Sequence, residues 1–220
     1  MNRVIHFTKK FESILRIVDS KSLKFFYCKE DFRVKGQLKS RAAHPMVCFC
    51  HFNNTSKPPF NNSYGNYGIE FSEKWAIKKK VSPVVYIEQK SQLSTALNTL
   101  LKARRDKKSY GDLSLSIILI KCYTKNLIGY NSKLKVKNFN FKDENEWRYV
   151  PLKKEIEGNF ISINRKDHVN KIDYYNDLIS KYSLKFKEID IQKIYVENQE
   201  EKNIIYEKFN IDLNRIIINT

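Results

Sequence analysis

The chain of 220 residues is short of the features that mark secreted and membrane proteins. It has only four cysteines, too few and too scattered for a disulfide framework in a chain of this size. No apolar run approaches the roughly 18–20 residues that span a bilayer, and the longest, residues 113–120, has the length of a strand. The start, MNRVIHFTKK, has basic and polar residues where a signal peptide is apolar. We therefore expect a cytoplasmic protein with reduced thiols and no membrane partner.

The cysteines and histidines also lack the spacing of a metal site. Cys48 and Cys50 should point to one face of a strand, with His44 and His51 nearby. A structural zinc site usually has two ligand pairs at C-x-x-C or H-x-x-x-H spacing, and the sequence has no such pairs here. We therefore predict no metal site.

Acidic residues are scarce relative to basic ones, and the net charge is +17. Such an excess favours a nucleic-acid partner, although lysine is spread through the chain and arginine, the better base reader, is sparse. The candidate contacts to nucleic acid or to an acidic partner are Lys78, Lys79, Lys80, Arg104 and Arg105, the last two within the stretch KARRDKK. A nucleic-acid-binding module predicts that both clusters share one face. The alternative is that they are solvated helix ends.

Hydrophobic residues make up 41% of the chain and aromatic residues 13%, which indicates a folded core. Short strand patterns, such as residues 3–8 and 46–51, alternate with helical patterns, such as residues 91–108 and 200–209, without regular βαβ repeats. This order predicts a single α+β domain over residues 1–220, with a largely antiparallel sheet of short strands and flanking helices.

Two segments are harder to assign from their periodicity. Residues 29–41 are polar and basic with mixed periodicity, and we expect a helix or a loop there. Residues 113–122 form the most hydrophobic run, which suits either a strand or a buried helix.

The stretch YGNYGIEFSEKWAIKKKVSPVVYI, residues 64–87, is the most distinctive in the chain. Tyr64 and Tyr67 each precede a glycine, which suits either a ligand-facing segment with stacking rings or a tight turn before an edge strand. We expect a positive φ at Gly65 or Gly68. The turn-rich loop that precedes the stretch, residues 52–63, is a candidate mobile flap.

The segment DENEWRYVP, residues 143–151, predicts an acidic entry into a strand. In a strand, Glu146 and Arg148 share one face and Trp147 lies on the other. Trp147 is the natural candidate for the core. Glu146 is then either a functional carboxylate or a structural one, paired with Arg148 or with a lysine.

Four blocks, VIHFT, MVCFC, the tyrosine–glycine stretch and DENEWRYVP, occur in the same order as in the AbiGi-type abortive-infection proteins of phage defence. The chain resembles that family over residues 3–151. The resemblance implies a role in phage resistance, as the antitoxin-like or sensor partner in a two-component system. It also implies a protein partner, either a toxin or a phage component, and leaves the biochemical activity open.

A strand ending in His-Phe-Thr, followed by a helix with Ser-Ile-Leu, is also similar to the opening of ADP-ribosyltransferases that modify nucleic acid or protein. This more distant resemblance implies an NAD-dependent enzyme as an alternative, with an ADP-ribosyltransferase-like fold and NAD as its cofactor. The implied NAD-binding residues are His6, Thr8, Tyr64 and Tyr67, and the implied catalytic residue is Glu146.

The chemistry of that reaction explains these residue types. Breaking the glycosidic bond of NAD develops positive charge, which a carboxylate such as Glu146 can stabilise. The enzymatic hypothesis requires His6, a tyrosine and Glu146 to converge in one cleft. The alternative for His6 is a strand-end histidine whose ring is bonded to the backbone.

Overall fold

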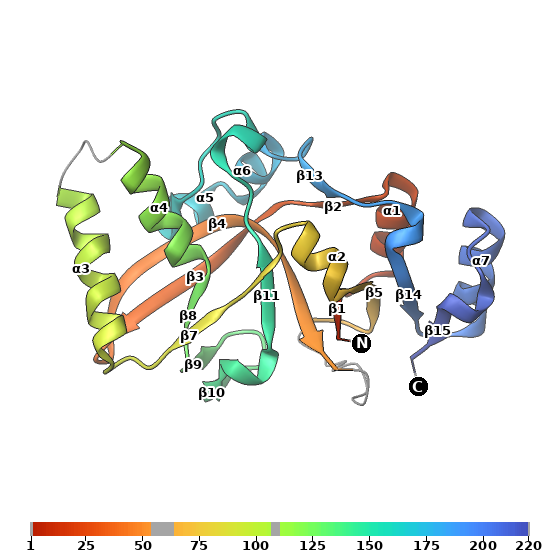
Figure 1. Cartoon of the computed structure of the whole chain (residues 1–220), viewed down its shortest axis with the longest axis horizontal. Helices are drawn as coiled ribbons and strands as arrows, with labels where there is room; N and C mark the ends of the chain where they lie inside the picture. The colour runs from red at the N-terminus through yellow and green to blue at the C-terminus, as the bar shows by residue number, and fades with distance from the viewer. Residues whose placement is uncertain (1, 54–63, 107–110, 220) are drawn as a thin grey trace.

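The structure is a computed structural model that describes residues 2–53, 64–106 and 111–219 (Figure 1). Its main sheet crosses the molecule in the order β15-β14-β5-β1-β4-β11-β6. These strands are β15 (Ile216–Ile218), β14 (Ile191–Val196), β5 (Tyr67–Ser72), β1 (Arg3–Thr8), β4 (Gln37–Phe52), β11 (Glu146–Tyr149) and β6 (Ser82–Pro83). Neighbours pair antiparallel except β14 and β15, which are parallel. The predicted α+β fold with a largely antiparallel sheet is confirmed.

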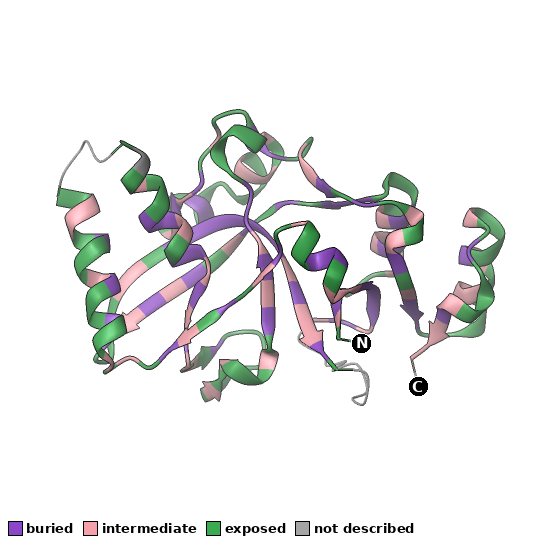
Figure 2. Ribbon diagram, viewed as in Figure 1, coloured by how far each residue is buried: buried purple, intermediate pink, exposed green. Residues whose placement is uncertain are grey.

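Strand β4 is the longest in the described chain, and it joins two regions of the molecule. Its first part forms a hairpin with β3 (Phe26–Val34) and also pairs with β12 (Ile163–Asn164). Its last part pairs with β1 on one side and with β11 on the other. Figure 2 shows β4 buried along much of its length.

The expectation of a helix or loop over residues 29–41 is wrong, because this segment forms the β3–β4 hairpin. Glu30, Phe32 and Val34 are buried at every second position, so the strand period is present. Glu30 is polar although it faces inward, so the sequence alone does not show the alternation of apolar and polar residues that a strand would have. The two residues of the turn, Lys35 and Gly36, have φ of 49° and 75°, as tight hairpin turns of this kind require.

Helices flank the sheet, as Figure 1 shows. They are α1 (Phe11–Ser20), α2 (Glu73–Lys78), α3 (Gln92–Asp106), α4 (Gly111–Cys122), α5 (Arg165–Asn170), α6 (Ile172–Leu178) and α7 (Gln199–Phe209). The ambiguous run at residues 113–122 is therefore helical. Within the described chain, no helix has both the length and the apolar character that crossing a membrane requires.

Small two-stranded units complete the fold. They are β2 (Ser22–Lys24) with β13 (Ser183–Lys185), β7 (Val85–Ile87) with β8 (Thr124–Asn126), and β9 (Ile128–Asn131) with β10 (Val136–Asn140). The main core packs α1 and α2 against the sheet, and a smaller core lies under α3 and α4. Strand β8 follows α4 and carries Lys125, whose ion pairs with Glu144 and Glu146 place it beside the start of β11.

The tyrosine–glycine stretch turns into an internal strand and not an edge strand, because β5 lies between β1 and β14. Gly65 has φ of +105°, which confirms the predicted positive φ. A Cβ at this position would lie 2.1 Å from the carbonyl oxygen of Thr8, so only glycine fits. The expected flap over residues 52–63 falls for the most part outside the described residues.

Candidate functional site: a buried ion-pair cluster

Strand β11 supplies the two charged residues at the centre of the candidate site. Glu146 and Arg148 alternate with Trp147, so the two charged side chains share one face of the sheet. Trp147 lies on the other face, where its ring stacks on His51 with centroids 4.8 Å apart. The expectation that tryptophan is buried in preference to arginine is therefore wrong: Trp147 is only partly buried against the core, whereas Arg148 is 0% exposed.

Arg148 is the hub of this cluster because its guanidinium binds groups from two other parts of the chain and from its own strand. Its Nε donates to Glu146 Oε1 at 2.8 Å and its Nη2 donates to Glu146 Oε2 at 3.0 Å. The same Nη2 donates to Glu30 Oε1 at 2.7 Å, and Nη1 donates to the carbonyl of Cys122 at 2.5 Å. Two carboxylates and a backbone carbonyl thus satisfy one fully buried cation.

Lys125 on β8 adds a second cation beside the same carboxylate. Its Nζ lies 3.0 Å from Glu146 Oε2 and 2.6 Å from Glu144 Oε2. The hydroxyl of Tyr64 donates to the other oxygen of Glu144. The hydroxyl of Tyr86 accepts a hydrogen bond from the backbone N–H of Glu146 at 2.8 Å. The cluster therefore links strands that lie far apart in the sequence.

The charges set the ionisation of the cluster. Burial alone would raise the pKa of Glu146, but the positive charges and hydrogen bonds of Arg148 and Lys125 outweigh it and lower the pKa well below its usual range. Burial would likewise lower the pKa values of Lys125 and Arg148, yet the facing carboxylates raise both. Burial and the neighbouring Glu144 raise the pKa of Tyr64. Glu146, Lys125 and Arg148 therefore remain charged at neutral pH.

His6 does not join this cluster. In the register of the sheet, Ile5 and Glu146 both pair with Cys50, so these three residues share a face and His6 points to the opposite one. The His6 Nδ1 bonds to the backbone carbonyl of Cys48 at 2.9 Å, and its ring contacts Phe49 edge-on. This is the backbone-bonded arrangement that the sequence left as the alternative.

The other residues proposed to bind NAD are divided between the two faces. Tyr64 reaches the cluster through Glu144, whereas the Tyr67 hydroxyl bonds to Glu197 at 3.0 Å and to Glu201 at 2.8 Å. Thr8 pairs with Tyr67 at the end of β1. Of the proposed NAD-binding and catalytic residues, Tyr64 therefore lies beside the cluster of Glu146, whereas Thr8 and Tyr67 lie with His6 on the opposite face of the sheet.

The basic clusters lie on separate helices. Lys78 ends α2, and Lys79 and Lys80 follow it, whereas Arg104 and Arg105 lie near the end of α3. In Figure 1, α3 lies at the far left and α4 and β7 intervene before α2. Arg104 donates to Ser114 Oγ and Arg105 to the carbonyl of Lys39, so both have partners within the chain. The contact roles of these residues remain predictions.

The thiols lie close to the same cluster. Cys28 and Cys48 hydrogen-bond to each other, which lowers the pKa of Cys28 and raises that of Cys48. Cys50 Sγ donates to the carbonyl of Glu144 at 3.2 Å. Among the described residues, no group of three or more histidine, cysteine, aspartate or glutamate side chains is placed to hold a metal ion.

Sequence reasoning identified Glu146 and named Arg148 or a lysine as its partner, but it missed Glu30 and did not single out Lys125. The Glu-x-Arg spacing in a strand was the signal that predicted the pair of Glu146 and Arg148. Glu30 lies 118 positions from Arg148 along the chain, and Lys125 lies 21 positions from Glu146. No local pattern could reveal those contacts.

One comparison with known proteins gives a match. The model of a family described as "Putative abortive phage resistance protein AbiGi, antitoxin" matches residues 21–197, which contain every charged residue of the cluster. No curated protein and no solved structure matches the chain.

Proposed function

Because the chain belongs to the AbiGi family of abortive phage resistance proteins, we propose that it is an antitoxin of phage defence that acts by binding a toxin protein. The observation that carries this proposal is the extent of the family match, which runs from β2 to the end of β14. It includes the ion-pair cluster, α4 and every strand of the main sheet except β1 and β15. The match therefore associates the antitoxin role with most of the fold and not with one short motif.

The arrangement of the cluster favours a structural role within a binding protein over a catalytic one. Both oxygens of Glu146 already accept hydrogen bonds from Arg148 or Lys125. The guanidinium of Arg148 is enclosed by its partners. Such a network fixes the positions of β3, β8 and β11 relative to one another, which supports a rigid surface for a partner.

The other hypotheses have less support. A transferase requires His6 and Glu146 around one ligand, and the two side chains point to opposite faces of the sheet. The family description names an antitoxin, not a sensor or a nucleic-acid-binding protein. A catalytic role for Glu146 remains a prediction that the binding experiment in the Discussion tests.

A growth experiment tests the proposed function. The candidate toxin is the protein encoded next to the gene of this chain, provided that its expression alone arrests growth. We expect co-expression of the chain to restore growth, because a bound toxin is withdrawn from its target. A chain that is expressed and folded but leaves growth arrested would refute the antitoxin role.

A further inference from the structure

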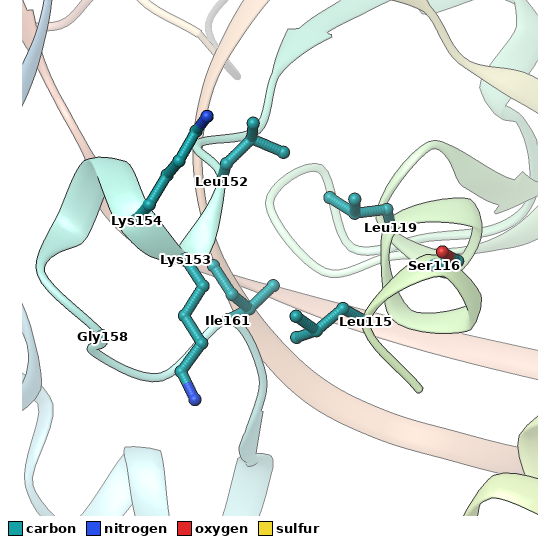
Figure 3. A pocket seen from close by; sticks show the side chains of 8 residues that line it. All are labelled: Leu115, Ser116, Leu119, Leu152, Lys153, Lys154, Gly158 and Ile161. Carbon is teal, nitrogen blue, oxygen red and sulfur yellow. The ribbon is translucent and has the colours of Figure 1, made fainter. Parts of the chain in front are cut away.

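A groove of about 520 Å³ lies between α4 and the segment that follows β11 (Figure 3). The residues that carry the argument are Leu115, Leu119, Leu152, Lys153, Lys154 and Ile161. In Figure 3, Leu152 faces Leu119 and Ile161 faces Leu115, so apolar side chains converge from both walls. Its size and apolar lining are those of a ligand-binding or peptide-binding site. We call it the α4 groove.

Helix α4 exposes more apolar surface than a covered helix would. Its apolar residues run all round the helix, an arrangement typical of a helix buried on every side. Ile117 and Ile118 are buried, but Leu113 and Ile120 are each 51% exposed and Leu115 is 37% exposed. Leu152 on the other wall is 39% exposed. Exposed apolar residues gathered around a groove indicate an interaction surface.

The charges beside the groove are basic. Lys153 and Lys154 extend in opposite directions from one wall, as Figure 3 shows, and neither forms an ion pair among the described residues. The nearby carboxylates are occupied. Glu155 accepts from the Tyr149 hydroxyl and from the Leu152 N–H, and Glu157 pairs with Lys181 at 2.7 Å. An apolar floor flanked by free ammonium groups is complementary to an acidic amphipathic segment.

We propose that the α4 groove is the docking site for the toxin, which inserts an amphipathic segment with acidic flanks. The inference rests on the proposed antitoxin function and identifies the surface that performs it. Apolar side chains of the segment pack between Leu119 and Leu152, and its carboxylates face Lys153 and Lys154. A second copy of this chain is disfavoured as the occupant. Each copy has a net charge of +17, so the two copies and the lysines at their contact would repel each other.

The test measures binding of the purified candidate toxin to the full chain and to two variants of equal charge. The first variant is Lys153→Glu/Lys154→Glu, at the groove. The matched control is Lys202→Glu/Lys208→Glu on α7, which lies at the opposite end of the molecule from α4 in Figure 1. All four lysines are at least partly exposed, so both variants should fold. We expect the groove variant to bind about tenfold more weakly or worse, mainly through slower association, and the control to bind nearly as the wild type does.

Hydrogen exchange of the wild-type complex adds a second measurement that involves no mutation. We expect the toxin to slow exchange in residues 111–122 and 152–161. Equal loss of affinity in both variants, or slowed exchange only elsewhere, would overturn the docking site and leave the antitoxin role standing. A groove variant that changes self-association of the chain and not toxin binding would assign the groove to a second copy. Absence of any complex with the wild-type chain would refute the antitoxin proposal and the docking site together.

Discussion

At the scale of single residues, the molecule depends most on Arg148, a cation enclosed among its partners. Burying a charge is costly unless ion pairs and hydrogen bonds compensate, and here Glu146, Glu30 and the Cys122 carbonyl do so. The sequence predicts the pairing of Glu146 with Arg148, because residues two apart in a strand share a face. It does not predict that the arginine, and not the neighbouring Trp147, is completely enclosed. The positions of Glu30 and Lys125 across the fold decide that outcome.

We predict that Arg148→Met strongly destabilises the protein. The change leaves the buried carboxylates of Glu30 and Glu146 with one cation fewer, and breaking a buried pair in this way costs about 3–5 kcal/mol. The free energy of unfolding, from urea titration, measures the loss. Arg165→Met is the matched control, because it removes a partly exposed pair with Asp31 and should cost at most about 1 kcal/mol. Similar losses in the two variants would show that the Arg148 pairs are not a structural centre.

Acidification should lower stability before any carboxylate titrates. Burial, and then the charge of Lys121, lower the pKa of His44 from 6.5 to about 3, although its Nδ1 bonds to the carbonyl of Ile161. Below pH 6.5 His44 therefore binds a proton in the unfolded chain but not in the folded chain. The contribution of the neutral His44 to stability is complete above pH 6.5 and is lost as pH falls toward 3.

The variant His44→Gln isolates that contribution. It keeps a donor for the Ile161 carbonyl and removes the titrating ring. Urea titrations between about pH 6.5 and 5, where carboxylates of ordinary pKa stay ionised, should show a slope shallower than in the wild type by about 1 kcal/mol per pH unit on average, approaching about 1.4 near pH 5. Burial also lowers the pKa of His6, so part of the dependence of stability on pH should remain in both proteins. Identical slopes would mean that His44 titrates normally in the folded state.

At the scale of secondary-structure elements, local periodicity predicts much of the fold and fails where a contact across the fold overrides it. Strand β1 and helices α3 and α7 lie close to their expected positions, because their apolar residues recur at the period of one element. The β3–β4 hairpin was missed because Glu30 points inward to Arg148. Helix α4 was ambiguous because its apolar residues have no single face.

The turn that leads into β5 should tolerate no side chain at Gly65. We predict that Gly65→Ala costs more than about 1–3 kcal/mol, because it adds a clash with the Thr8 carbonyl to the strain of a positive φ. Gly36→Ala is the matched control. Its φ is +75°, and nothing lies within 4 Å of the added Cβ, so it measures strain alone. Thermal melts compare the two variants, and equal losses would remove the argument from close approach.

At the scale of the whole molecule, the fold separates the residues that the sequence suggested as one site. The sheet holds His6 and Glu146 on opposite faces, and Tyr67 bonds to carboxylates of the C-terminal region while Tyr64 bonds to Glu144. The sequence blocks that resemble AbiGi proteins therefore contribute mainly to the central sheet and its ion-pair cluster. The apolar surface of the α4 groove lies outside those blocks for the most part, and only the folded chain reveals it.

We propose that the chain neutralises its toxin by binding and not by chemistry. Calorimetric titration of purified toxin with the chain, without and with NAD, combined with the intact mass of both proteins, tests this directly. We predict saturable heat at a fixed ratio of the two proteins without NAD, and unchanged masses with it. A complex that fails to form without NAD, together with an ADP-ribose adduct on the toxin that a folded Glu146→Gln chain cannot produce, would show that the chain acts as a transferase and not by binding alone.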